Sequence, residues 1–409
     1  MSTIRIYQTD RYMTENKAEI TAVREINGFD TFTCTQSVFF PVGGGQPSDT
    51  GTVSLGDKVY EVVSASDNGL ESDVWHLTDA PSGTFHTGDE VTLTIDWDVR
   101  FRNMQRHLGE HMLSGTMHTL FGGVNKGFHM GEDFITIDID LGGRMLTNEE
   151  LDLAERTVNE AIWADLPVTV TCYDDYESSL EMPVRKAVPH DGKVYVVTVG
   201  DLKDPYDCIA CCGTHPASSS EVGLLAIYKC DPNKGMNRIF FDCGKMARDK
   251  LAADSRLLAE IAKRYSCSTS DLMKRLDTEA ENISALKARI AGLSSYVRDA
   301  ERTKIIEDMT LSVGDVYTYS SDILSVDELL KLGFSVIEDT NDQILLMMHP
   351  ESLTCLVFSS GEVKCGKLIK EHAPEFGGRG GGRDDNARAV FRSAADMRAF
   401  ASAVEKMLQ

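Results

Sequence analysis

The first 95 residues alternate short apolar and polar stretches, which is the pattern of β-strands with one face buried. Val, Ile, Thr and Phe are frequent in these stretches, and Gly, Asp and Ser separate them. A series of short strands joined by tight turns is typical of an antiparallel barrel or sandwich. The pattern therefore predicts a small N-terminal β-barrel from the runs TFTCTQSVFF, GTVSL, KVYEVVSAS and EVTLTID.

From Asp96 the pattern changes to a mixture of helices and strands. The run HLGEHMLSGTMHTL predicts a helix, FITIDIDL predicts a strand, and NEELDLAERTVNEAIWADL predicts a second helix. Two further strands, PVTVTCY and KVYVVTV, precede a cysteine-rich loop at residues 208–215. These elements together predict an α+β domain.

A third segment, near residues 249–300, has helical periodicity throughout. Ser268, followed by Asp271 three residues later, predicts a capping-box start within it. The apolar residues recur mostly at alternating steps of three and four, which is the spacing of a coiled-coil seam. A helix packed on its own protein explains this pattern as well as a dimer seam does, because the repeat covers only about four heptads. The seam comprises Leu272, Leu276, Ile283, Leu286, Ile290, Leu293, Val297 and Ala300.

The C-terminal quarter of the chain predicts a compact α/β domain with a Gly-rich loop at residues 377–383. A chain of 409 residues exceeds what one hydrophobic core usually serves, so several domains are expected. The predicted fold class is α+β. Its four parts are a β-barrel at 1–95, an α+β domain at 96–244, a helical coiled-coil arm at 245–305 and the α/β domain at 306–409.

The composition is that of a soluble globular protein, with 42% hydrophobic and 26% charged residues. The N-terminus has no apolar stretch of the kind found in secretory signals, and the longest apolar runs are far too short to span a membrane. We therefore expect a cytoplasmic protein that does not associate with membranes. Its ten cysteines are expected to be reduced, with one or two of them free to bind a metal.

The net charge of −23 argues against a protein that coats nucleic acid without specificity, because each phosphate contact needs a local cation. Residues 364–392 reverse this charge, with seven basic side chains against four acidic ones. This segment is a candidate RNA-facing surface. Its candidate contacts are Arg379, Gly380, Gly381 and Arg383, since backbone amides of a Gly-rich loop can meet phosphates. A flexible surface turn is the alternative interpretation.

Two short motifs, far apart in the chain, carry candidate metal ligands. His107 and His111 are four residues apart in a predicted helix, so both imidazoles project from one face. Cys211 and His215 are also four residues apart and follow a predicted strand. Together the two pairs offer three imidazoles and one thiolate, a suitable tetrahedral set for Zn²⁺.

Alternatives to this metal site remain open at the level of the sequence. His118 lies on the same helix face, Cys208 forms a CxxC pair with Cys211, and Cys212 adjoins Cys211, so each is a rival ligand. The run HLGEH also fits the H-x-x-E-H pattern of certain metallopeptidases, with Glu110 as the base. That interpretation needs an acidic third ligand on a later helix and leaves CCGTH unexplained.

The paired motifs resemble those of the alanyl-tRNA editing proteins, which comprise the freestanding AlaX type and the editing region of alanyl-tRNA synthetase. Their signature is HxxxH followed by CxxxH, the latter usually written CGGTH. Four more segments match in order, and EFGGRGGGR resembles the Gly-rich C-terminal domain shared by the synthetase, the longer AlaX proteins and DHH-type phosphoesterases. The resemblance covers nearly the whole chain and indicates the long AlaX form. The four segments are FFPVGGGQPSDTG, IDWDVRFRNMQRH, FHMGEDFITID and KGMNRIFF.

Two departures from the family pattern occur at the motifs themselves. Leu108 and Gly109 stand where the family usually has Thr-Ala after the first histidine. Cys212 occupies the second position of the CGGTH motif, so a thiol lies beside a predicted ligand.

The resemblance implies a hydrolase that deacylates mischarged tRNA-Ala at one Zn²⁺ ion per chain and so supports the fidelity of translation. Serine is the expected cargo, with glycine second. Gln46, in the GGGQ turn, is the candidate for a polar contact to the substrate. Ser37 aligns with a threonine that senses the serine hydroxyl in the family.

Two further expectations concern partners and the role of the metal. The helical arm and the C-terminal domain are candidate surfaces for a homodimer. The alternative function is a tRNA- or RNA-binding factor with a purely structural zinc, because four protein ligands close a tetrahedral site.

Overall fold

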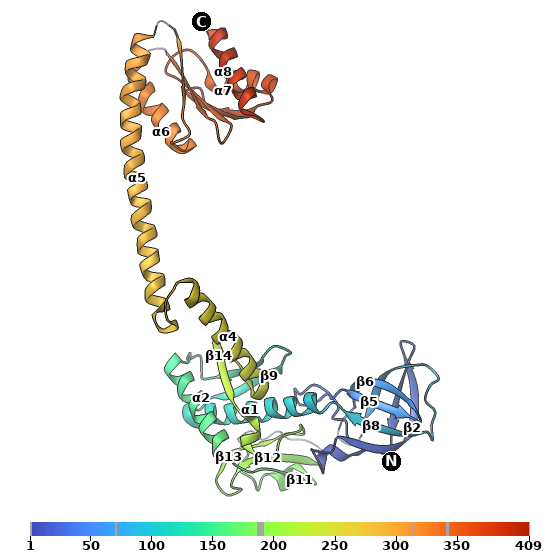
Figure 1. The fold of residues 1–409 in the computed structure, drawn as a ribbon. Helices are drawn as coiled ribbons and strands as arrows, with labels where there is room; N and C mark the ends of the chain where they lie inside the picture. The colour runs from blue at the N-terminus through green and yellow to red at the C-terminus, as the bar shows by residue number, and fades with distance from the viewer. Residues whose placement is uncertain (1, 70–71, 186–191, 313, 341–342, 409) are drawn as a thin grey trace. The chain divides into compact units, whose positions relative to one another are not determined.

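The computed structural model describes residues 2–69, 72–185, 192–312, 314–340 and 343–408. The chain divides into two units, Met1–Glu260 and Ile261–Gln409 (Figure 1). None of the helices within the described ranges is long and apolar enough to cross a membrane.

Six antiparallel strands at the N-terminus close into a barrel in the order β2-β3-β7-β6-β5-β8. Phe32, Val53 and Leu93 are among the buried side chains that fill it, because alternate residues of each strand face the interior. The predicted β-barrel is confirmed. A short parallel pair, β1 (Ile4–Arg5) and β4 (Gln36–Ser37), accompanies it. The barrel strands are β2 (Glu15–Ile26), β3 (Phe29–Cys34), β5 (Gly51–Leu55), β6 (Lys58–Ser66), β7 (Trp75–Pro81) and β8 (Glu90–Ile95).

Two antiparallel sheets, two longer helices and most of a third complete the first unit. One sheet has the strand order β14-β15-β10-β9 and the other has the order β11-β12-β13. The helices are α1 (Trp97–Phe121), α2 (Asn148–Trp163) and α4 (Gly244–Arg264), with a short α3 (Tyr176–Ser179). The strands are β9 (Val124–Met130), β10 (Ile135–Asp140), β11 (Val168–Tyr173), β12 (Val194–Gly200), β13 (Pro205–Ala210), β14 (Leu225–Asn233) and β15 (Met236–Cys243).

Helix α1 is the central element of this unit. The Asp96 side chain caps its start by accepting the backbone N–H of Asp98 at 3.0 Å, and Gly122, with φ of 68°, ends it. The helix packs against α2 and against strands of both sheets. All residues from 103 to 117 except Gln105 are buried, so the polar side chains of this stretch need partners inside the protein.

Arg100 and Asp49 form a buried ion pair between α1 and the segment that leads into β5. Both side chains are fully buried, and the Arg100 Nε atom lies 3.0 Å from Asp49 Oδ2. The same guanidinium donates to the Val38 carbonyl oxygen at 2.6 Å. This pair fixes the loop that carries residues 38–50 against the first turn of the helix.

The second unit contains the long helix α5 and a five-stranded sheet with the order β16-β17-β18-β20-β19. Among its described strands only β16 and β17 are parallel, so the predicted α/β domain is built on a mostly antiparallel sheet. Its helices are α5 (Leu272–Leu311), α6 (Val326–Ile337), α7 (Cys365–His372) and α8 (Ala394–Leu408). Its strands are β16 (Val316–Ser320), β17 (Ile344–His349), β18 (Thr354–Ser359), β19 (Arg379–Gly382) and β20 (Asn386–Val390).

The structure differs from the predicted elements at two places. The helix predicted over residues 249–300 is interrupted between α4 and α5, where the Ser268 hydroxyl caps the N–H of Asp271 at 3.2 Å. The Gly-rich segment, predicted as a loop, contains the edge strand β19. A Cβ atom at Gly380 would collide with the Arg388 carbonyl group, so glycine permits the close pairing of β19 with β20.

Replacement of Asp49 by Asn should destabilise the first unit, because the buried Arg100 guanidinium would lose its carboxylate. Breaking a buried ion pair costs about 3–5 kcal/mol in the free energy of unfolding. Urea unfolding followed by tryptophan fluorescence measures this loss, since Trp75, Trp97 and Trp163 all lie in the first unit. The control is Asp57→Asn, at an exposed position in the β5–β6 turn. Equal stability of the two variants would contradict the prediction.

Candidate metal centre

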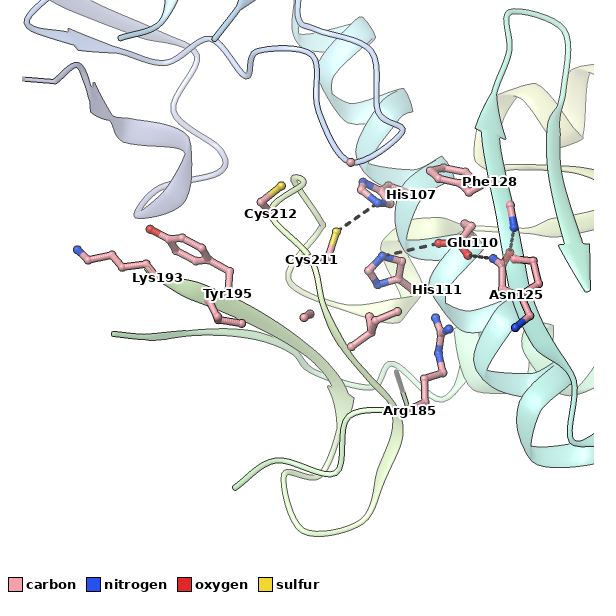
Figure 2. Close-up of a pocket in the computed structure, with 16 residues that line it drawn as sticks. His107, Glu110, His111, Asn125, Phe128, Arg185, Lys193, Tyr195, Cys211 and Cys212 are labelled. Atoms are coloured by element: carbon pink, nitrogen blue, oxygen red, sulfur yellow. Dashed lines mark hydrogen bonds and ion pairs between the residues drawn. The ribbon is translucent and has the colours of Figure 1, made fainter. Parts of the chain in front are cut away.

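The structure brings the four predicted ligands together. One possible ligand atom from each of His107, His111, Cys211 and His215 lies within 4.8 Å of the others. The two histidines on α1 have ring centroids 4.9 Å apart, and the His215 ring lies 4.6 Å from that of His107. The Cys211 sulfur is 3.4 Å from His107 Nε2, and Figure 2 draws this contact as a dashed line.

The chemistry of these donors fits a metal cation. Among the described residues, His111 Nδ1 and both ring nitrogens of His215 are buried without a hydrogen-bond partner, and such atoms need an explanation. Burial lowers the pKa of His107 to about 4 and lowers the pKa values of His111 and His215 as well. The imidazoles are therefore neutral and can donate lone pairs. Burial raises the pKa of the Cys211 thiol, so a thiolate there needs a nearby cation such as Zn²⁺.

The described cluster does not include the three rival ligands. His118 lies exposed near the end of α1, seven residues beyond His111, which is about 10 Å along a helix axis. The Cys208 thiol lies in β13, where it is 3.7 Å from the Thr198 hydroxyl. Cys212 lines the adjoining cavity but is not one of the four clustered residues.

Gln46 holds His107 and does not line the cavity described below. Its Oε1 atom lies 2.8 Å from His107 Nδ1 and accepts the backbone N–H of Thr214 at 3.1 Å. Because that N–H can only donate, the amide orientation is fixed and His107 Nδ1 must carry the proton. The Gln46 Nε2 atom donates to the Thr214 hydroxyl at 2.9 Å. Gln46 therefore leaves His107 Nε2 free for a metal, which is a different role from the predicted substrate contact.

Glycines on both sides of His107 allow this close packing. Gly43 and Gln46 exchange backbone hydrogen bonds of 3.1 and 2.9 Å, and Gly45 has φ of 82° within that turn. A Cβ atom on Gly45 would collide with the Phe128 ring, and one on Gly213 would collide with the His107 ring. The GGGQ sequence is thus both a tight turn and a support for the ligand.

Ser37 lies inside the barrel rather than at the cluster. Its hydroxyl is 2.8 Å from His76 Nε2 and accepts the backbone N–H of Phe39 at 3.0 Å. Ser37 and His76 are fully buried, and His76 stacks on Phe32 in the barrel core. Because the side chain is directed into that core, the structure does not support the hydroxyl-sensing role expected from the resemblance.

A cavity of about 450 Å³ adjoins the cluster, which is large enough for a small-molecule group. Asn125, Arg185 and Tyr195 line it and were not singled out in the sequence, because no local pattern places their segments beside α1. The full lining comprises Gly44, His107, Glu110, His111, Asn125, Lys126, Gly127, Phe128, Arg185, Lys193, Val194, Tyr195, Ile209, Ala210, Cys211 and Cys212.

The candidate RNA contacts lie in the second unit. Arg379, Gly380, Gly381 and Arg383 are all exposed. Among the described strands, β19 pairs only with β20, so one edge of this strand has unpaired backbone groups.

Comparison with known proteins gives matches at several levels. The family model described as "Threonyl and Alanyl tRNA synthetase second additional domain" matches residues 194–240, which include Cys211 and His215. The alanyl-tRNA editing protein AlaX-L of Pyrococcus horikoshii is 26% identical over 407 residues, and the alignment covers 98% of each chain. The resemblance to the long AlaX form is confirmed.

Longer proteins match over the same region. The alanine–tRNA ligase of Caldivirga maquilingensis is 28% identical over 402 residues, covering 96% of this chain and 43% of the ligase. The chain thus spans less than half the length of that ligase. The C-Ala domain of Aquifex aeolicus alanyl-tRNA synthetase matches 24% of this chain at 18% identity, with a TM-score of 0.21 that is too low to support a shared fold.

Replacement of Gln46 by Leu should weaken zinc binding about 10–100-fold, which is the usual cost of losing an outer-shell partner of a metal-bound histidine. The variant removes the acceptor that orients His107. Competition with a chromogenic chelator measures the affinity. The control is Gln36→Leu, whose side chain donates to the Lys17 carbonyl oxygen on the barrel and should leave zinc affinity unchanged. Wild-type affinity in the Gln46 variant would show that His107 needs no such support.

Proposed function

We propose that this protein hydrolyses the aminoacyl ester of mischarged tRNA-Ala, with serine as the main cargo and glycine second. The observation that carries the proposal is the cluster of His107, His111, Cys211 and His215 in the wall of a cavity. The name of AlaX-L, an alanyl-tRNA editing protein that aligns over 98% of both chains, supports the same activity here. The protein is accordingly a hydrolase.

The chain contributes binding and orientation to this reaction. The cluster of His107, His111, Cys211 and His215 would hold a Zn²⁺ ion, which would supply a Lewis acid able to polarise a carbonyl group or to lower the pKa of a water molecule toward ~7. Gln46 keeps the proton of His107 on Nδ1, away from the cluster. Because an aminoacyl ester is intrinsically labile, a positioned water can suffice, and the scheme needs no serine or cysteine nucleophile.

The second unit supplies the proposed tRNA contacts. Arg379 and Arg383 flank the glycines of an exposed edge strand, where side-chain cations and backbone amides can both meet phosphates. This local basic segment accounts for tRNA binding by a chain whose net charge is −23.

An RNA-binding factor with a structural zinc is the second candidate, favoured by one observation. Four protein ligands fill a tetrahedron, and closed sites of this kind are usually structural. A metallopeptidase is less consistent with the site, because the described cluster holds no carboxylate ligand.

A deacylation assay distinguishes these functions. The wild type should release serine rapidly from Ser-tRNA-Ala, release glycine more slowly and spare Ala-tRNA-Ala, and a chelator should stop the reaction. Cys211→Ala should lose both zinc and activity, because the thiolate ligand is removed. Cys212→Ala, the adjacent thiol outside the cluster, is the matched control and should keep one zinc per chain. Retained tRNA binding with no release from any of the three substrates would support the RNA-binding factor instead.

We also propose a homodimer through one face of helix α5. Ile283, Leu286, Ile290 and Leu293 are 51–62% exposed at steps of three and four, whereas Ile305 and Met309, further along, are buried against α6. An exposed apolar stripe with this spacing suits a second copy of the same helix.

The double variant Leu286→Glu with Ile290→Glu should therefore convert a dimer to a monomer, because it places like charges along the seam. Light scattering after size exclusion measures the mass. Ser284→Glu with Ala288→Glu adds the same charge to the opposite side of the helix and should leave the dimer intact. A wild-type protein that is monomeric at micromolar concentration would contradict this assembly.

A further inference from the structure

Glu110 is a buried carboxylate that faces the cavity beside the metal cluster. Its side chain is only 7% exposed, yet it lines the cavity together with His107 and His111. The proposed hydrolysis assigns no role to Glu110. A buried carboxylate without a cationic partner is costly, so its position needs an explanation.

The hydrogen bonds of Glu110 occupy one of its two oxygens. The Ser114 hydroxyl donates to Oε1 at 2.6 Å. The Asn125 amide donates to the same atom at 2.8 Å (Figure 2). The other oxygen, Oε2, lies 3.7 Å from His111 Nε2, which is beyond hydrogen-bond distance. No described residue donates a hydrogen bond to Oε2. The carboxylate is thus held in place with one oxygen free for a donor from the cavity.

The cations that line the cavity do not neutralise this carboxylate directly. Arg185 forms an ion pair with Asp207, at 2.6 Å between Nε and Oδ1. Lys126 and Lys193 also line the cavity, and both are exposed. The cavity wall therefore combines a buried carboxylate with two exposed lysines. This combination suits a ligand that carries both a cation and anions.

We propose that Glu110 binds the α-ammonium group of the aminoacyl residue, an inference that rests on the proposed function. Aminoacyl-tRNA has the complementary distribution of charge, with an ammonium group on the amino acid and phosphates beyond the terminal ribose. The ester carbonyl carbon is two bonds from the ammonium nitrogen. With that nitrogen at Glu110 Oε2, the ester lies beside His111 and the rest of the cluster.

This assignment makes a free amino group a condition for binding. An acylated amine carries no charge and has only one hydrogen to donate, so peptidyl-tRNA would leave the Glu110 carboxylate without a cationic partner. The site would therefore hydrolyse aminoacyl esters and spare esters whose amino group is already in a peptide bond.

The test uses two non-hydrolysable probes, adenosine analogues with serine or with 3-hydroxypropanoic acid in amide linkage at the 3′ position. The two differ only in the amino group, so no bulk is added. The zinc-loaded wild type should bind the seryl probe about 10–100-fold more tightly by calorimetry, which is the range for a hydrogen bond to a charged group. Glu110→Gln should bind both probes equally, and Glu110→Asp, which keeps the charge, should retain part of the preference.

The outcomes separate this inference from the proposed function. If the wild type does not release serine from Ser-tRNA-Ala, the proposed function fails. Two outcomes would overturn only the role of Glu110, provided that the wild type does release serine. One is that the wild type shows no preference for the seryl probe, and the other is that Glu110→Gln keeps this preference. An equal loss of affinity for both probes in Glu110→Gln, together with a lower zinc content, would also overturn it, because Glu110 would then serve the orientation of His111.

Discussion

The structure of the first unit depends on the need to pair the polar side chains of a buried helix. Helix α1 carries arginine, histidine and glutamate into the interior, where an unpaired charge or polar atom would be strongly destabilising. Arg100 forms an ion pair with Asp49, in the segment that leads into β5, and Arg106 forms an ion pair of 2.8 Å with Asp242 of β15. These contacts attach distant parts of the chain to one helix. The candidate metal centre depends on the same pairing, since His107 takes its partner from the GGGQ turn.

This arrangement places the proposed metal ligands and the proposed partner of the substrate ammonium group on one turn of helix. His107 and His111 are on the face that meets the segment after β13, and Glu110 lies beside His111 at the edge of the cavity. Because the helix backbone fixes their separation, the distance between a bound ammonium group and the cluster is also fixed. Gly213 contributes by having no side chain, which lets the backbone approach the His107 ring.

Much of this could be predicted from local sequence. The alternation of apolar and polar residues indicated the barrel strands, because a strand has a period of two, and the spacing of His107 and His111 placed them on one helix face. Other features depended on contacts with residues that are distant in the sequence. Ser37 looked like a site residue, but its strand directs it into the barrel core. The Gly-rich segment looked like a loop, but part of it forms strand β19 by pairing with β20.

By itself the sequence determined the types of element, the four candidate ligands and the likeness to the AlaX proteins, because these reside in spacings of a few residues and in short motifs. Only the tertiary structure decided that Cys211, 104 residues after His107, meets it when Cys208 and Cys212 do not. It also assigned Gln46 to His107 and left one oxygen of Glu110 facing the cavity. The physical reason is that backbone geometry sets spacing within an element, whereas contacts between distant segments depend on the packing of the whole unit.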